Sequence, residues 1–136
     1  MEKNLKKIRV VAGAIIQEEQ ILIALRSSAM SSPMLWELPG GKVEDGETDQ
    51  EALKRELIEE LGVVVLVQEV LANSMITVGN RPLEMYVYRC VVQAGVPTAR
   101  EHAALRWVDV EQLTALRWAP ADVPLLSSMS YWLKGN

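Results

Sequence analysis

The stretch from Gly40 to Val63, GGKVEDGETDQEALKRELIEELGV, constrains this chain more than any other because it specifies a turn, a helix and both helix ends. Thr48 and Glu51 have the spacing of a capping box, in which each side chain binds a backbone N–H of the other residue. Gly62 follows the last apolar residue of the helical pattern, and glycine at that position ends a helix in the left-handed conformation. The stretch therefore predicts a helix from Thr48 to Leu61.

This helix is predicted to have an apolar side and an acidic side. Its leucines recur at helical spacing and form the side that faces a core. Glu56, Glu59 and Glu60 are three and four residues apart, so their carboxylates project side by side. Like charges at this spacing destabilise a helix slightly, and a divalent cation bound by oxygen ligands would reverse that penalty. Taken alone, the three glutamates leave open the alternative of a solvated acidic face.

Runs of β-branched and apolar residues predict strands on both sides of this helix. Proline and two glycines at 39–41 predict a sharp turn whose backbone a ligand can approach closely. The expected strands are Lys7–Ile16, Ile21–Leu25, Val63–Val70 with a continuation over Ala72–Val78, Leu83–Gln93 and Leu105–Asp109, and the further helices are Val110–Leu113 and Pro120–Leu133. Ile21–Leu25 is the expected hairpin partner of the first strand, and the long strands on either side of the turn at 79–82 are expected to pair antiparallel. This mixture predicts one α/β domain over residues 1–136, layered around a mixed sheet.

Composition narrows the classes of function. The net charge is −4 and the pI is about 5.1, which argues against an extended nucleic-acid partner because such partners require a basic face. A small anionic substrate stays possible where metal ions screen the acidic groups. Cys90 is the single cysteine, so no intrachain disulfide forms. The first ten residues lack a secretory pattern and no apolar run has the length of a membrane span, so we expect a cytoplasmic protein.

The acidic helix belongs to a longer pattern that resembles the defining box of the Nudix hydrolase family. That box reads G-x5-E-x7-R-E-U-x-E-E-x-G-U, where U is aliphatic, and residues 41–63 match it at every position. The resemblance implies an α/β/α sandwich and Mg²⁺-dependent cleavage of a nucleoside diphosphate linked to another group, with Mn²⁺ as a substitute. It also implies that Glu47 and Arg55 pair to hold loop and helix in register. The implied metal ligands are the carbonyl of Gly40 and the carboxylates of Glu56, Glu59 and Glu60.

Outside the box, the chain is similar to the MutT-type nucleoside triphosphate pyrophosphohydrolases, including the bacterial pyrimidine (CTP-type) members. The similar segments are WELPGGKVE at Trp36–Glu44 and APADVPLL at Ala119–Leu126. In that group the residue at Arg26 contacts substrate and the residue at Asp122 reads the base edge. MutT itself has Asn at the position of Asp122 and Phe at that of Leu38. Strict selectivity for 8-oxo-guanine is therefore not implied, and the pyrimidine-type members carry Asp at this position.

The resemblance implies a reaction in which Mg²⁺ neutralises the phosphates and lowers the pKa of a water molecule. A carboxylate removes the proton, and the water attacks the β-phosphorus to give a nucleoside monophosphate and pyrophosphate. Glu56 is the first choice as general base. Glu101 lies six residues before Trp107, where an acid of a late loop joins the metal site, and it is the second choice. Such an enzyme would cleanse the nucleotide pool, as a monomer or a homodimer.

Several of these residues also have ordinary structural interpretations. Arg26 ends a strand, where a solvated arginine is common, and contact with phosphate or base is the alternative. Gly41 and Lys42 stand where phosphate would bind, although Lys42 also fits a plain surface position. Asp122 could simply favour the dipole at a helix start. The single histidine, His102, is interpreted as structural or exposed rather than as a ligand.

The sequence leaves two other functions open. The first is hydrolysis of a different diphosphate, such as ADP-ribose or a dinucleotide polyphosphate, which no added recognition motif supports. The second is a non-catalytic nucleotide-sensing or RNA-binding module on the same fold, which predicts a degraded box. Trp36 and Trp118 could line a base pocket, but tryptophans more often fill a core.

Overall fold

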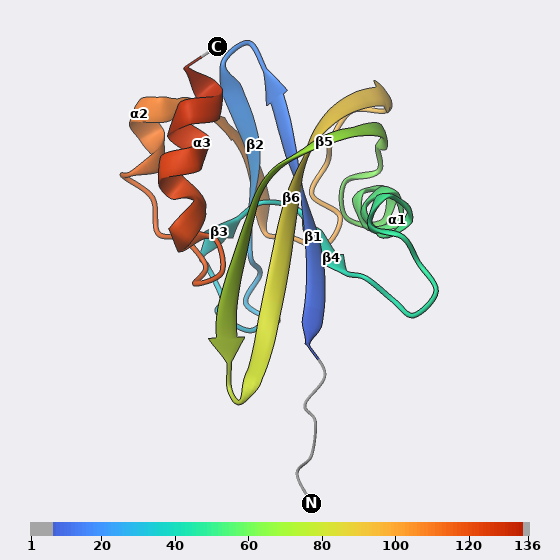
Figure 1. Cartoon of the computed structure of the whole chain (residues 1–136). Helices are drawn as coiled ribbons and strands as arrows, with labels where there is room; N and C mark the ends of the chain where they lie inside the picture. Colours follow the sequence, from blue (N-terminus) through green and yellow to red (C-terminus); the bar gives the residue numbers. More distant parts are fainter. Residues whose placement is uncertain (1–6, 135–136) are drawn as a thin grey trace, which may run out of the picture.

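The computed structural model describes residues 7–134 as a sheet held between two layers of helix (Figure 1). One layer is a single helix, and the other contains two shorter helices from the end of the chain. The elements, in chain order, are β1 (Ile8–Gln17), β2 (Gln20–Leu25), β3 (Trp36–Glu37), β4 (Gly40–Lys42), α1 (Asp49–Leu61), β5 (Val64–Val78), β6 (Arg81–Ala94), β7 (Ala104–Val108), α2 (Val110–Leu113), the 3₁₀ turn η1 (Val123–Leu125) and α3 (Leu126–Leu133).

The sheet is mixed and centres on β1. Strands follow the order β3-β2-β1-β6-β5, while β4 pairs with β1 and β7 pairs with β2. β1 runs parallel to β6 and antiparallel to both β2 and β4. The predicted hairpin of β1 and β2 forms through Glu18 and Glu19, whose φ values of 51° and 64° are typical of a tight two-residue hairpin turn. β5 and β6 form the predicted long antiparallel pair.

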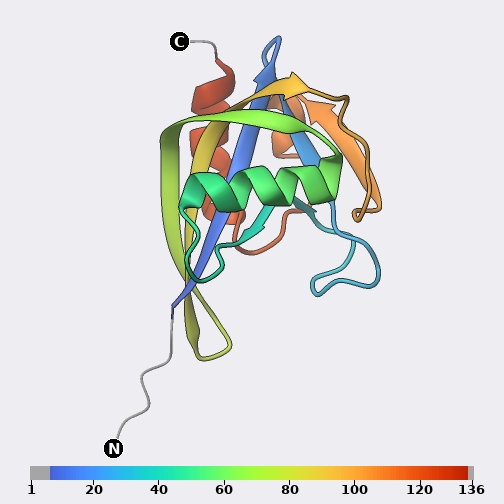
Figure 2. The same cartoon turned by 90° about the vertical axis from the view of Figure 1, so that its right-hand side faces the viewer.

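Alternation along β1 divides the apolar core between the two faces of the sheet. Val11 and Ile15 join the cluster beneath α1, and Ala12 and Ala14 join the cluster beneath α2 and α3. Figure 2 shows α1 running across the strands on the first of these faces. Both faces of β1 are buried, which explains why its sequence is an almost continuous apolar run.

Helix α1 forms as its sequence predicts. The Thr48 hydroxyl accepts from the N–H of Glu51, and the Glu51 carboxylate accepts from the N–H of Thr48. Gly62 ends the helix with φ 72° and donates to the carbonyl of Ile58. The leucines of the predicted apolar side are fully buried against the sheet. Arg9 of β1 ties the other end down through two bonds to Asp49, of 2.7 and 2.8 Å.

Two predicted elements differ in the structure. Residues 40–42 form a short strand against β1 rather than a plain turn, because their backbone finds hydrogen-bonding partners in Val10–Ala12. The terminal helix begins later than Pro120: residues 119–122 make a turn, η1 follows, and α3 starts at Leu126. Pro124 has no N–H to donate, and the Asp122 side chain caps no helix.

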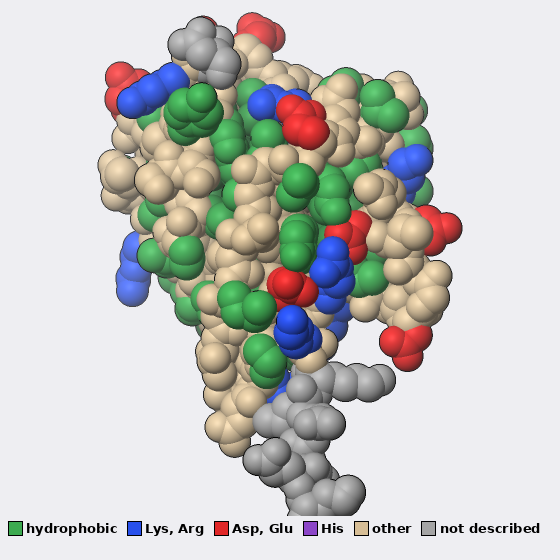
Figure 3. All heavy atoms as spheres, viewed as in Figure 1, with side chains coloured by type: hydrophobic (Ala, Val, Ile, Leu, Met, Phe, Trp, Pro, Cys, Tyr) green, Lys and Arg blue, Asp and Glu red, His purple; other side chains and the backbone are tan. Residues whose placement is uncertain are grey.

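The surface seen in Figure 3 mixes charged and apolar side chains, with acidic and basic groups lying close together near its centre. Among the exposed apolar side chains are Val70, Met75 and Val78 of the long strand β5. Among residues 7–134, no helix combines the length and the apolar content that crossing a membrane requires.

Candidate active site

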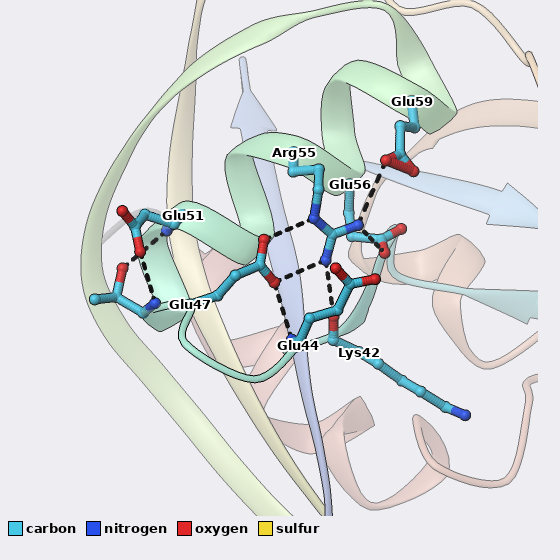
Figure 4. Close-up of polar contacts among 8 residues, drawn as sticks. Lys42, Glu44, Glu47, Glu51, Arg55, Glu56 and Glu59 are labelled. Atoms are coloured by element: carbon cyan, nitrogen blue, oxygen red, sulfur yellow. Dashed lines mark hydrogen bonds and ion pairs between the residues drawn. The ribbon is translucent and has the colours of Figure 1, made fainter.

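Arg55 is the centre of an ion-pair network that joins the β4–α1 loop to helix α1 (Figure 4). Its guanidinium makes two bonds to Glu47, of 2.7 and 2.9 Å, and donates at 3.1 Å to the carbonyl of Lys42. It also donates to Glu56 at 2.9 Å and, at 3.4 Å, to Glu59. The bond from Arg55 is the main reason why the pKa of Glu47 falls to about 2. The predicted pairing of Glu47 with Arg55 is thus present in the structure.

Two consecutive glycines in β4 let the backbone approach both β1 and the carboxylates. A side chain on Gly40 would collide with the carbonyl oxygen of Val11 and the Cα of Ala12. A Cβ on Gly41 would lie 2.6 Å from both carboxylate oxygens of Glu56. The Glu56 carboxylate therefore occupies the space that any other residue at position 41 would fill.

Glu56 and Glu60 lie together but in different surroundings. Only 6% of Glu60 is exposed, and its carboxylate accepts from the N–H of Gly40 at 3.2 Å. Burial, and then a hydrogen bond to Glu56, raise the pKa of Glu60 well above its usual range. The pair therefore holds either a shared proton or a cation. The three glutamates do not share one solvated face: Glu60 is buried, Glu56 is half-buried and Glu59 is exposed.

This arrangement fits a hard divalent ion. Mg²⁺ generally takes one or two protein carboxylates and completes its shell with water and substrate phosphates. The carboxyl pair of Glu56 and Glu60 and the exposed carboxylate of Glu59 on the same helix are such oxygen donors. Within residues 7–134, no three acidic, histidine or cysteine side chains come close enough to form a complete metal cage. A partial set of protein ligands is nevertheless what a phosphate-bridged ion requires.

Glu101 is not gathered into this group. It lies exposed in the segment between β6 and β7, and no hydrogen bond or ion pair within residues 7–134 joins it to the glutamates of α1. The segment itself is fixed to the end of α1, because the N–H of Arg100 donates to the carbonyl of Glu60 and that of Thr98 to the carbonyl of Leu61.

A cavity of about 480 Å³ opens beside the carboxyl pair, within the size range of small-molecule sites. Strand residues such as Val10, Leu83 and Met85 give it an apolar wall. The wall also includes seven residues assigned to the site from sequence: Arg26, Leu38, Gly40, Gly41, Lys42, Glu60 and Asp122. Segments far apart in the chain thus meet around one space.

Asp122 is almost fully buried, with 1% exposed, in the wall of this cavity. Its carboxylate accepts from the N–H of Leu38 at 2.6 Å. Desolvation raises the pKa of Asp122 to about 8, although the bond from Leu38 acts in the opposite direction. A short parallel bridge between Trp36 and Trp118 aligns the two segments that carry these residues. Asp122 is therefore a cavity residue and not a helix-capping charge.

Glu37 and His102 also line the cavity, and sequence reasoning did not assign either of them to the site. Arg26 donates to Glu37 at 2.8 Å and to the carbonyl of Ser31 at 2.6 Å. His102 Nε2 lies 2.8 Å from the other carboxylate oxygen of Glu37. The signal available in the sequence was an acidic residue inside the apolar segment 34–38, next to the glycine turn.

The remaining aromatic and basic residues have simpler positions. Trp118 is buried in the core, and its indole N–H donates to the carbonyl of Leu113 at 2.8 Å. Trp36 packs at the edge of the same cluster. The Lys42 side chain is exposed and extends away from Arg55 (Figure 4), while residue 42 as a whole lines the cavity.

The raised pKa of Asp122 predicts a pH-dependent stability. The folded state holds the proton up to pH about 8, whereas the unfolded chain releases it near its ordinary value of 3.8. Between these values the folded state binds more protons, so the free energy of unfolding falls as pH rises from about 4 to about 8. We expect Asp122→Asn to remove about 2 kcal/mol or more of this fall. Urea denaturation in metal-free buffer between pH 5 and pH 8 measures it, and parallel curves for both proteins would contradict it.

Comparison with known proteins places this geometry in a family. The model of the NUDIX domain matches residues 7–129. The CTP pyrophosphohydrolase of Escherichia coli is 39% identical over 91% of this chain and 92% of its own length. A protein of Mycobacterium tuberculosis named putative 8-oxo-dGTP diphosphatase 2 is 39% identical over 93% of this chain and 91% of its own.

The folds agree as well. The solution structure of the E. coli ORF135 protein superposes with a TM-score of 0.83 at 38% identity, and the match covers 96% of this chain and 93% of that one. The mixed sheet between two helical layers is the Nudix α/β/α sandwich, as the sequence predicted. Nudix hydrolases act with a divalent metal ion, and the carboxyl pair beside Gly40 suits one. The chain belongs to the Nudix hydrolase family of enzymes.

Proposed function

We propose that this protein is a Mg²⁺-dependent pyrophosphohydrolase that converts (deoxy)nucleoside triphosphates to a nucleoside monophosphate and pyrophosphate. One observation carries the proposal: Glu60, which contacts Glu56, lines the same cavity as the buried carboxyl group of Asp122. A nucleotide requires both features, since its phosphates bind beside the metal ligands and its base needs a shaped apolar pocket with few polar groups.

The residues divide by role. Arg55 holds Glu56 and Glu59 and ties the loop down through Glu47, so it orients the reacting carboxylates without taking part in proton transfer. A bound divalent ion would neutralise phosphate charge and acidify a water molecule. Glu56 then accepts the proton of the attacking water, with Glu101 as the second choice. The proposed metal ligands are Gly40, Glu56, Glu59, Glu60 and Glu101, and the proposed substrate residues are Arg26, Leu38, Gly41, Lys42 and Asp122.

Two relatives support a triphosphate as substrate, because their names specify CTP and 8-oxo-dGTP. We propose that Asp122 helps to select the base of the nucleotide. At neutral pH its raised pKa keeps a large share of this carboxyl group protonated, so it can donate a hydrogen bond as well as accept one. We propose that the substrate is a canonical, oxidised or methylated nucleotide of the cellular pool. We also propose that residues 1–136 act as one domain, in the cytoplasm, as a monomer or homodimer.

The test is a substrate panel. The protein is incubated with Mg²⁺ and CTP, dCTP, 5-methyl-dCTP, dGTP, 8-oxo-dGTP, ADP-ribose and a dinucleotide polyphosphate, and the products are identified by chromatography. We expect pyrophosphate and a monophosphate from at least one triphosphate, no reaction in EDTA and partial recovery with Mn²⁺. Glu59→Gln is expected to lower kcat by about a hundred-fold or more, because losing a residue that only supports a metal ligand already costs roughly 10- to 100-fold.

Two outcomes would overturn the proposal. Activity confined to ADP-ribose or the dinucleotide would assign the enzyme to the other substrate class of the family. A Glu59→Gln variant with full activity would remove Glu59 from the proposed metal ligands and contradict the proposed metal site. Glu111→Gln is the matched control, since Glu111 is an exposed helical glutamate on α2, outside the cavity.

A further inference from the structure

His102 and Glu37 form a pair in the cavity wall that lies outside the Nudix box. His102 Nε2 is 2.8 Å from Glu37 Oε2, and only 2% of the His102 side chain is exposed. Both residues line the cavity. The pair joins segments 65 residues apart in the sequence, so its geometry depends on the complete fold.

The surroundings of His102 determine which nitrogen carries the proton. An ionised Glu37 only accepts hydrogen bonds, so Nε2 is the donor. Within the described part of the chain, Nδ1 is buried and has no hydrogen-bond partner. A buried polar atom without a partner costs free energy, and native structures keep few of them. The contact with Glu37 is therefore the one hydrogen bond that the described structure gives the imidazole.

The backbone on both sides of His102 is anchored to separate elements. The N–H of Arg100 donates to the carbonyl of Glu60 at 3.1 Å, and the Arg100 side chain donates to the carbonyl of Ile58 at 3.0 Å. The N–H of Ala103 donates to the carbonyl of Leu25 at the end of β2, at 2.8 Å. His102 is thus held between the metal-binding end of α1 and the strand that leads to Arg26.

Glu37 is fixed from two sides. Arg26 Nη1 donates to Oε1 at 2.8 Å, while His102 Nε2 donates to Oε2. A carboxylate oxygen has two lone pairs, so one acceptor position on each oxygen remains. Because Glu37 lines the cavity, these positions are available to a ligand there.

We propose that His102 is a positioning residue for substrate binding. It acts through Glu37, holding the carboxylate so that its remaining lone pairs accept a hydrogen bond from an N–H or O–H donor of the bound nucleotide. The donor is an exocyclic amino group of the base or a hydroxyl of the sugar. This inference rests on one part of the proposed function, which is that the cavity binds a nucleotide. It does not require catalysis.

Binding of monophosphates tests it independently of hydrolysis. Calorimetric titration with CMP, UMP and dCMP compares the wild type with His102→Leu, which removes the donor, and with His102→Gln, whose amide N–H can replace it. We expect His102→Leu to raise Kd about ten-fold and His102→Gln to stay within three-fold of the wild type. An effect seen with CMP and dCMP but not with UMP would assign the donor to the amino group. An effect seen with CMP and UMP but not with dCMP would assign it to the 2′-hydroxyl of the sugar, and an equal effect with all three to the 3′-hydroxyl.

A double-mutant cycle separates positioning from a general packing role. In the Glu37→Ala background, His102→Leu should change Kd by less than two-fold, because nothing remains to be positioned. The inference would be overturned if the fold-changes in Kd of the two single variants multiplied in the double variant. It would also be overturned if His102→Leu bound nucleotide with wild-type affinity. Thermal melts of each variant show whether it is folded. If His102→Leu is not, His102→Asn gives the same test, because its shorter amide does not reach the position of Nε2. A wild type that binds these monophosphates but hydrolyses no triphosphate would refute only the proposed function. A wild type that hydrolyses a triphosphate but shows no dependence of nucleotide binding on His102 would refute only the inference.

Discussion

Replacing Glu56 by glutamine is expected to lower kcat for triphosphate hydrolysis about a thousand-fold while the protein stays folded. The amide keeps the size of the side chain, so it still fits above Gly41. It cannot accept a proton, and a positioned general base contributes roughly 10²- to 10⁴-fold to a rate. Its charge is also lost from the carboxyl pair with Glu60. Pyrophosphate release at saturating Mg²⁺ measures the effect, and a thermal melt checks the fold.

Glu101→Gln is the informative comparison for this variant. Glu101 is exposed and makes no bond to α1, so we expect its loss to reduce kcat less than the loss of Glu56. The opposite order would make Glu101 the base and Glu56 a metal ligand only. Glu111→Gln, away from the cavity, should have the activity of the wild type.

Replacing Gly40 by alanine is expected to have the largest effect on stability. The new Cβ would overlap the carbonyl oxygen of Val11 and lie 2.7 Å from the Cα of Ala12. Both are backbone atoms of the central strand, which cannot rotate away as a side chain could. We expect the free energy of unfolding to fall by about 3 kcal/mol or more, at the upper end of overpacking effects. Urea denaturation in metal-free buffer measures this change.

Gly46→Ala is the matched control for that substitution. Gly46 has φ 85°, and a Cβ there would meet no atom within 4 Å. Alanine at this position therefore has no steric clash, and its cost is that of the left-handed backbone conformation, about 1–2 kcal/mol. If Gly40→Ala and Gly46→Ala lowered the free energy of unfolding equally, the close packing of β4 against β1 would be contradicted.

Helix α1 could be predicted from sequence because the signals that define it are local. The Thr48 capping box, the leucine spacing and Gly62 all act within one or two helical turns, and each does what the pattern indicated. The pairing of Arg55 with Glu47 came from the family resemblance and is present at 2.7 Å. The long pair of β5 and β6 was also expected, since its turn and its alternating residues are adjacent in the chain.

The features that sequence missed depend on contacts between distant segments. Residues 40–42 become a strand only because β1 supplies hydrogen-bonding partners. The spacing alone left open that Glu60 lies on a solvated face with Glu59, but Glu60 is buried and accepts from the N–H of Gly40. The role of Glu37 requires Arg26 and His102 together, and no spacing along the chain reveals that meeting.

The proposed metal-binding glutamates and the proposed base-contacting Asp122 reach one cavity from helical layers on opposite faces of the sheet. Glu56 and Glu60 come from the helix on one face, whereas Asp122 enters from the segment that precedes α3 on the other. That segment is aligned by the Trp36–Trp118 bridge and by the bond from Leu38 to Asp122. We expect that grafting residues 117–126 from a relative would transfer nucleotide preference while the hydrolytic machinery stays intact.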